Sequence, residues 1–503
     1  MEGSMVLLST FRATIIICKF KMAENAEDVI SKQQLILDNY FNLLGSFAFD
    51  KGKEFFVEFI FKCSEFDDFM SQLLKNYANF LFLGPKGFLR KDSSLKSTYE
   101  SLLNEFQRLE EKHYITPVST PTMSPSSSYK TPSPPSTLPS PSPVSACSEV
   151  SGSVASSLSN TSSVRGSTNN LPSYLGEDIL ENLASHLCGQ LSSFVRARLK
   201  TMEFYEKMYS MSSSKYMKFD ILLNALNEII KTNLKLFHHP MLSPIKSSFS
   251  LECEIIVKLL EAEIHMQNWR FLPSLLCLHD AHSKLGSWVS VPKDMKRSAV
   301  TGAFRIPPTP MLYNWLRILK AALVSKFSLY FHEILSKQTT PADMKNFCAK
   351  ASYDYFSKIV SFQKKYDCAC VTIVLDTNGL DDYTGHGYCH PDKICETPKG
   401  LDSFPAIVSY PPVKKYLLHW PSVVMIMNNK EQEIRNTESA VPIFDSRMNA
   451  TYFLAKIEAR MTLVVIFESK KTERDTQIHR FIQSMCTQLR GNKLFSNLKP
   501  GSK

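Results

Sequence analysis

Soft sulfur and imidazole side chains gather in one stretch of this chain of 503 residues. They are Cys368, Cys370, His386, Cys389, His390 and Cys395. Such donors could surround zinc, so a zinc-binding enzyme that uses the loop from His386 to Cys395 is one hypothesis. The spacing opposes it, because structural zinc is usually held by Cys-x-x-Cys pairs and no such pair occurs in the sequence. We therefore expect packed cysteines and loop histidines, with no metal and no cofactor.

Two pairs of neighbouring histidines are weaker candidates. His279 and His282 are one turn apart on an expected helix, and His238 and His239 precede Pro240. Neither pair has a partner ligand at a fixed spacing. We expect these rings to bond to backbone or to cap helix ends.

The motifs of common enzyme classes fail in this sequence. A dinucleotide-binding loop needs glycines in a fixed order, and the nearest match, Gly385 to Gly387, has His390 at its third glycine position. His332 and Glu333 begin a zinc-protease pattern, but the second histidine one helical turn on is missing. We conclude that the chain is not an enzyme.

Composition indicates a folded protein of a reducing compartment. Hydrophobic residues make up 44% and charged residues 21%, and the 12 cysteines are scattered. The net charge of +10 is dispersed, which argues against nucleic acid as a partner. An adaptor that binds acidic membrane surfaces through basic patches stays open as an alternative. The apolar runs within residues 5–20 are interrupted by Arg12 and are shorter than the roughly 20 residues of a spanning helix.

Five segments follow from the change of pattern along the chain. We expect a dispensable extension at residues 1–21, helices over 22–112, a disordered Ser/Pro-rich linker over 113–173, further helices over 174–340, and a smaller α/β domain over 341–503. Each helical piece has an apolar face that needs covering, so the linker should interrupt one helical bundle. Repeated Ser-Pro and Thr-Pro steps make the linker a possible target of phosphorylation.

Apolar residues at helical spacing predict the inward faces of three helices. One stripe contains Leu251, Ile255, Leu259, Ala262 and Met266. A second, after Trp269, contains Leu272, Leu275, Leu276 and Leu285. A third, in one long helix, contains Leu312, Trp315, Leu316, Leu319, Leu323, Phe327, Phe331 and Leu335.

Short β-branched runs after residue 352 predict the strands of an antiparallel or mixed sheet. They are Val371–Leu375, Ala406–Val408, Val423–Met427 and Leu463–Phe467. A helix ending at Tyr366 precedes them, and a final helix should open at Thr472, where Asp475 completes a capping pattern, and run to about Leu489. The expected fold class is α+β.

Six segments in the same order closely resemble the small helical subunit of the KICSTOR complex, a family once labelled only as an uncharacterised open reading frame. They are Phe204–Tyr209, Phe237–Pro244, Phe271–Leu275, Phe327–Glu333, His419–Pro421 and Phe467–Asp475. The resemblance spans roughly residues 26–503 apart from the linker. It implies a helical bundle joined to a roadblock-like or longin-like domain.

The resemblance also implies a non-enzymatic scaffold role. Its partners would be kaptin-like, FG-GAP repeat and seizure-threshold subunits. The assembly would recruit the GATOR complex to the cytosolic face of the lysosomal membrane and restrain mTOR signalling when amino acids or glucose run short. Membrane association would then be peripheral and occur only through the complex.

Two of the six segments are candidate partner-binding sites. The first is a proline-containing turn between helices, and the second carries exposed charges between a strand and a helix. The candidate residues are Phe237, His238, His239, Pro240, Glu468, Lys470, Lys471 and Arg474. A rigid connector and a capped helix are the alternative explanations of the same segments.

Overall fold

The computed structural model describes residues 26–49, 51, 52, 54, 55, 71, 72, 74, 95–114, 173–288, 310–380, 383, 385, 398–412 and 417–498. The expected extension at 1–21 and almost all of the expected linker at 113–173 lie outside these residues. The helices of the helical part are α2 (Ala26–Gly45), α6 (Leu95–Tyr114), α7 (Ser173–Met211), α8 (Phe219–Asn233), η1 (Pro240–Leu242), α9 (Ser243–Gln267), α10 (Phe271–Trp288), α12 (Met311–Tyr330), α13 (His332–Gln338) and α14 (Pro341–Lys350).

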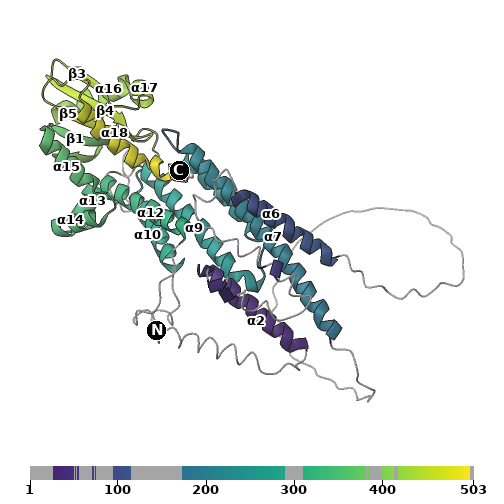
Figure 1. The fold of residues 1–503 in the computed structure, drawn as a ribbon. Coiled ribbons are helices and arrows are strands. Elements are labelled where there is room, and N and C mark those ends of the chain that lie inside the picture. Colours follow the sequence, from purple (N-terminus) through teal and green to yellow (C-terminus); the bar gives the residue numbers. More distant parts are fainter. Residues whose placement is uncertain are drawn as a thin grey trace, which may run out of the picture.

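Helices from both sides of the Ser/Pro-rich segment share one hydrophobic core. Helix α6 lies along α7, and α2 contacts α7 and α9 (Figure 1). Phe41 of α2, Phe106 of α6 and Val195 of α7 are all fully buried in that core. The last residue of α2, Gly45, passes so close to α9 that an added Cβ would lie 2.7 Å from Cβ of Pro244.

The remainder of the chain forms the sheet part, which lies at one end of the helical part (Figure 1). Its elements are α15 (Tyr355–Tyr366), β1 (Cys370–Leu375), η2 (Gly400–Ser403), β2 (Ala406–Tyr410), η4 (Leu417–His419), α16 (Trp420–Asn429), α17 (Glu431–Asn436), β3 (Val441–Asp445), β4 (Ala450–Lys456), β5 (Met461–Phe467), α18 (Thr476–Arg490) and α19 (Asn492–Ser496). The strand order is β2-β1-β5-β4-β3, and every described pairing is antiparallel. The chain is therefore of the α+β class.

Both faces of the sheet are covered. Alternate side chains such as Ile373 and Val465 pack into the core that is shared with the helical part. On that side, the ring of Phe362 in α15 stacks on Phe481 of α18 with centroids 3.8 Å apart. Residues of the opposite parity, such as Val464, pack under α16 and α17 in a second core. As a result β1, β4 and β5 are buried along their whole length.

The structure corrects the prediction of a strand over Val423–Met427, because these residues lie in helix α16. Pro421 occupies its first turn, where a missing N–H does no harm, and Val423, Val424 and Met427 face the second core. A short apolar run cannot be assigned to helix or strand by periodicity alone. The sheet instead contains two strands that were not predicted, β3 and β4. Strand β3 contains Pro442, and the residues of β4 do not alternate between apolar and polar types.

Two helix boundaries also differ from the prediction. The long helix expected over 312–335 breaks at Phe331, whose ring is buried against Trp269 with centroids 4.6 Å apart, and α13 starts anew at His332. Helix α18 begins at Thr476, because Asp475 is itself the cap. Its carboxylate accepts hydrogen bonds from the N–H of Gln477 and of Ile478.

The prediction that α10 turns its leucine stripe inward is wrong for three of four residues. Leu272, Leu275 and Leu276 are exposed, and Leu285 is buried. The buried face of α10 is instead made by Ser274, Cys277, Leu278, Ala281, Leu285 and Trp288. This helix has more apolar residues than one face can hold.

Candidate functional site

A group of charged side chains is buried where the helical part meets the sheet part. The ammonium of Lys326 in α12 donates to the carboxylates of Glu263 in α9 and of Glu458 in the turn between β4 and β5. The phenol of Tyr330, one turn on from Lys326, donates to Glu458 Oε2 at 3.1 Å. All four residues are buried. We call this group the junction network.

The protonation of the junction network follows from its burial. Burial raises the pKa of Glu263 to about 8; Lys326 opposes this effect and Glu458 reinforces it. Burial alone would lower the pKa of Lys326, but the two carboxylates outweigh it and hold that pKa above its usual value. Burial and Glu458 together raise the pKa of Tyr330 well above its usual value.

Further polar contacts fasten the two parts at the same junction. Lys215, in the loop after α7, donates to the carbonyls of Arg435 and Thr437 at 2.5 and 2.7 Å and so caps the end of α17. Trp315 Nε1 of α12 donates to the carbonyl of Leu494 at 3.0 Å. Within the sheet part, at the end of α18, Arg490 Nε donates to the carbonyl of Ile457 at 2.9 Å and holds the turn that carries Glu458.

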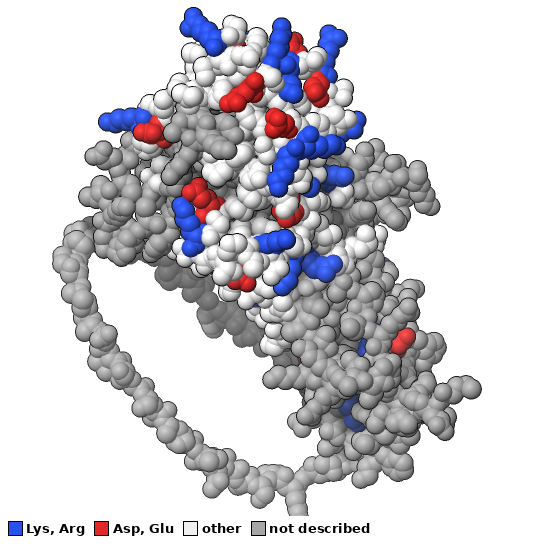
Figure 2. Space-filling model, turned by 90° about the vertical axis from the view of Figure 1, so that its left-hand side faces the viewer, with Lys and Arg blue, Asp and Glu red and all other residues white. Residues whose placement is uncertain are grey.

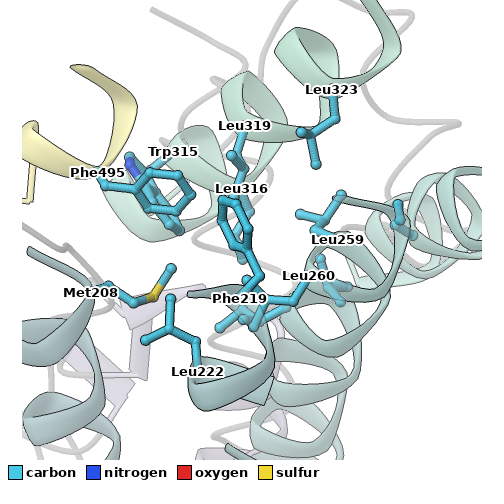
Figure 3. Close-up of a cluster of buried hydrophobic side chains, with 14 of the residues drawn as sticks. Met208, Phe219, Leu222, Leu259, Leu260, Trp315, Leu316, Leu319, Leu323 and Phe495 are labelled. Carbon is cyan, nitrogen blue, oxygen red and sulfur yellow. The ribbon is translucent and has the colours of Figure 1, made fainter. Parts of the chain in front are cut away.

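A small cavity lies beside the junction network. Apolar side chains from α8, α9, α12 and α19 converge around it, among them Phe219, Leu259, Leu323 and Phe495 (Figure 3). Glu263 and Lys326 also line it. The space open to the centre of a water molecule is about 20 Å³, which holds about one water. This cavity is far smaller than a pocket for a metabolite.

A second buried ion pair lies inside the helical part. Arg198 of α7 donates to Glu252 Oε2 of α9 at 2.5 Å, and the Tyr205 hydroxyl donates to Glu252 Oε1 at 2.8 Å. Tyr99 of α6 lies beside Arg198, and burial, partly offset by that guanidinium, raises the pKa of Tyr99 to about 12. These contacts join helices that stand before and after the Ser/Pro-rich segment.

The junction network is not among the predicted sites, although the sequence contains a signal for it. Lys326 follows the inward stripe of α12 between Leu323 and Phe327, and Glu263 follows Leu259 by four residues on the inward face of α9. A charged residue at a core position of a helix needs a partner, because an isolated buried charge is costly. Two opposite charges of this kind predict a buried pair.

In the structure the first predicted partner segment joins α8 to α9 and is bonded to α7. Phe237 is fully buried and packs against the ring of Phe194. The amides of His238 and His239 both donate to Gln190 Oε1 of α7, at 2.6 and 3.3 Å. His239 Nδ1 accepts from the amide of Met241 and caps η1, where Pro240 begins the turn. Of the four predicted residues, only His238 and Pro240 are exposed.

The second predicted segment lies at the end of β5 and does reach the surface. Glu468 Oε1 is 3.3 Å from Nε2 of the buried His419, whose Nδ1 is 2.8 Å from the Tyr452 hydroxyl. The ammonium of Lys470 stands over the ring of Phe444 in β3 at 5.4 Å. Glu468 and Lys470 are exposed.

The other two predicted residues of this segment behave differently. Lys471 is half-buried, with its amide bonded to Thr451 Oγ1 and its ammonium 4.8 Å from the Phe467 ring centre. Arg474 is exposed. The two predicted segments are not brought together, because η1 packs against α2 and α9, whereas this segment borders β3 and β4.

The structure describes only two members of the expected sulfur and imidazole group. Cys368 and Cys370 are buried, and burial raises the pKa values of their thiols to about 12 and about 11. His386, Cys389, His390 and Cys395 lie outside the described residues. Within the described ranges, no cluster of three or more potential metal ligands occurs.

Surface charge is mixed on the face of the molecule that carries the sheet part. Lys and Arg side chains stand among Asp and Glu side chains there, and they do not gather into one large basic area (Figure 2). Such mixing provides little long-range attraction for an anionic surface. Among the residues that the structure describes, no helix has the length and apolar character needed to cross a bilayer.

Comparison with known proteins identifies the family. A family model described as KICSTOR complex C12orf66 like matches residues 150–503. The chain is 35% identical over 492 residues to KICSTOR subunit 2 of Danio rerio, an alignment that covers 94% of this chain and 97% of the relative. The chain belongs to the KICSTOR C12orf66-like family. KICSTOR subunit 2 of Xenopus laevis is 44% identical over 328 residues, which cover 64% of this chain and 74% of the relative. The resemblance of the six segments to the KICSTOR family is thus confirmed, and membership of a multi-protein complex follows from it.

Proposed function

We propose that this chain is a non-enzymatic scaffold subunit of a KICSTOR-like complex. In this proposal the complex, with its kaptin-like, FG-GAP repeat and seizure-threshold subunits, recruits the GATOR complex to the lysosomal surface and restrains mTOR signalling during starvation. The observation that carries the proposal is the match to KICSTOR subunit 2 along nearly the whole of both chains.

The use of charge inside the molecule supports a scaffold role. Lys326, Glu263 and Glu458 fasten the sheet part to the helical part, and Arg198 and Glu252 fasten helices to each other. The cavity beside the junction network holds about one water. A scaffold needs such internal rigidity, because its partners bind to its outside surface.

The sheet part is proposed to be a roadblock-like or longin-like module, and the helices before it a bundle. A five-stranded antiparallel sheet with helices on both faces supports the first assignment. The packing of α2, α6, α7 and α9 around one core supports the second.

We assign partner docking to the surface at the end of β5, formed by Leu418, Phe444, Glu468 and Lys470. Leu418 is 80% exposed, and its neighbour His419 is held by Tyr452 and Glu468. Phe444 is 39% exposed under the ammonium of Lys470. Large apolar side chains on a fixed backbone, with charges at their rim, are typical of protein interfaces. The expected occupant is another subunit of the complex.

Affinity purification of the tagged full-length chain from starved cells tests this assignment. The Leu418→Glu variant should co-purify at least about tenfold less of the KICSTOR subunits than wild type, because a buried carboxylate at an interface costs more than about 1.4 kcal/mol. The matched control is Leu35→Glu, which alters another exposed leucine, 59% exposed on α2, and should leave recovery unchanged. Full recovery with Leu418→Glu would refute the docking surface. If wild type recovers no KICSTOR subunit, the proposed function itself fails.

A further inference from the structure

The junction network holds two carboxylates for one ammonium. Glu263 and Glu458 both accept hydrogen bonds from Lys326, whose side chain is 3% exposed. Tyr330 adds a neutral donor and does not change the balance. If both carboxylates were ionised, the network would carry one net negative charge in a region from which water is almost excluded. Such a charge is costly, and closely spaced buried carboxylates therefore retain a proton.

We propose that the junction network is a proton-dependent latch. One proton held by Glu263 and Glu458 keeps the β4–β5 turn packed against α9 and α12, and loss of that proton weakens this packing. The latch concerns the chain itself and does not depend on the identity of any partner.

The geometry indicates which carboxylate carries the proton. Both oxygens of Glu458 accept hydrogen bonds, one from Lys326 and one from Tyr330. Glu263 uses Oε1 for Lys326, and its Oε2 has no hydrogen-bond partner among the described residues. A protonated Glu263 can instead donate to Glu458, which lies within hydrogen-bonding reach. Protonation at Glu263 therefore adds a hydrogen bond and removes the surplus charge.

The other ionisable groups around the latch keep their protonation states near neutral pH. Burial raises the pKa values of Tyr330 and Tyr355, and it raises that of Cys486 in α18 to about 12. Lys326 stays charged because its pKa is raised. The guanidinium of Arg490 lines the adjoining cavity. Glu263, with a pKa raised to about 8, is thus the group whose proton is lost in this range.

The sign of the effect follows from the raised pKa of Glu263. In the closed latch this carboxyl keeps its proton up to about pH 8, whereas in an open, hydrated junction it ionises near its ordinary pKa of 4.5. The stabilisation by the latch is complete below about pH 4.5 and is lost as the pH rises toward 8. Each opening releases one proton, so the opening equilibrium constant should rise nearly tenfold per pH unit between about pH 5.5 and 7.5.

Hydrogen–deuterium exchange of the full-length chain tests the latch. Peptides that cover the β4–β5 turn are compared at several pH values, after correction for the intrinsic exchange rate. Protection should fall steeply with rising pH in wild type. In Glu263→Gln it should change little, because the amide can still donate to Glu458 but cannot ionise. The matched control is Glu261→Gln, also on α9, which removes a surface pair with Lys258 and should keep the wild-type pH dependence.

Two outcomes would overturn the latch. One is wild-type protection of the turn that does not change with pH, a result that needs no variant. The other is a Glu263→Gln chain, folded by circular dichroism, that keeps the wild-type slope. A carboxylic-acid infrared band near pH 7 that is present in wild type and absent in Glu263→Gln would independently assign the proton to Glu263.

Discussion

Arg198 lies in the core of the helical part, and the carboxylate of Glu252 balances its charge at 2.5 Å. Pairs of this kind add little stability compared with apolar residues of the same shape, but removal of one member is severe. The main effect of the pair is therefore to fix how α7 packs against α9, and its contribution to the stability of the fold is small.

Replacement of Glu252 by Gln should destabilise the protein strongly. The change takes the negative charge of Glu252 away from a buried guanidinium that it bonds, and the expected loss is about 3–5 kcal/mol of unfolding free energy. Denaturant unfolding monitored by circular dichroism measures it. Glu254→Gln provides the control, because its pair with Lys284 is on the surface and should contribute less than about 1 kcal/mol. Equal losses in the two variants would contradict this account.

The residues of the candidate site could be predicted from the sequence only in part. Charged side chains between a strand and a helix tend to stay in water, and this holds for Glu468, Lys470 and Arg474, whereas Lys471 of the same predicted set is half-buried. The burial of Phe237 could not be predicted, because a proline-containing turn indicates a connector between helices but does not indicate how deeply its side chains are buried. Lys326 and Glu263 stand 63 residues apart in the chain, and only the packing of α9 on α12 brings them together.

At the level of elements, the long helices were predictable because their apolar residues repeat at helical spacing, and β1, β2 and β5 because their residues are rich in β-branched types. The runs of β1 and β5 are strongly β-branched, and their strand assignments are confirmed. The same composition misled at Val423–Met427, where Pro421 starts a helix. Strand β3 was missed because Pro442 argues against a strand unless it stands at a sheet edge. Whether a strand lies at the edge of the sheet depends on the topology of the whole sheet, which a local sequence pattern cannot predict.

The contact of α2 with α9 gives a test at the level of elements. An added Cβ at Gly45 would stand 3.0 Å from the backbone of Pro244, which cannot turn aside as a flexible side chain can. Gly45→Ala should therefore displace α2 and cost about 1–3 kcal/mol. In α10, an added Cβ at Gly286 meets no described atom within 4 Å, so Gly286→Ala should be neutral or stabilise by about 0.4–1 kcal/mol.

Thermal unfolding and limited proteolysis of α2 distinguish these two glycine variants. Gly45→Ala should lower the melting temperature and speed cleavage within α2, while Gly286→Ala should do neither. Unchanged cleavage in Gly45→Ala would show that α2 can shift without loss of contact.

On the scale of the whole molecule, the helical part is built from chain segments on both sides of the Ser/Pro-rich stretch. Phe106 of α6 is fully buried in a core to which α7 and α9 also contribute, and Tyr99 lies against Arg198. Covalent continuity through the stretch is therefore not what holds α6 in place.

Two chains that span residues 22–114 and 173–503 should assemble when they are produced together. We expect them to elute from a sizing column as one complex of equal stoichiometry, because their apolar faces cover each other. The second chain alone should aggregate, since it would expose the face that α6 covers. Separate elution of two folded, soluble chains would show that the segments are independent.

The position of Pro442 has a consequence for how copies of this protein behave when crowded. Strand β3 ends the described sheet, and an end strand is a template onto which another chain can polymerise. Proline carries no N–H, and edge strands accept it with the missing donor toward solvent. A strand from a neighbouring copy that paired with β3 would thus lack one hydrogen bond of the ladder at Pro442. Pro442 in this way disfavours growth of the sheet by addition of strands from other copies.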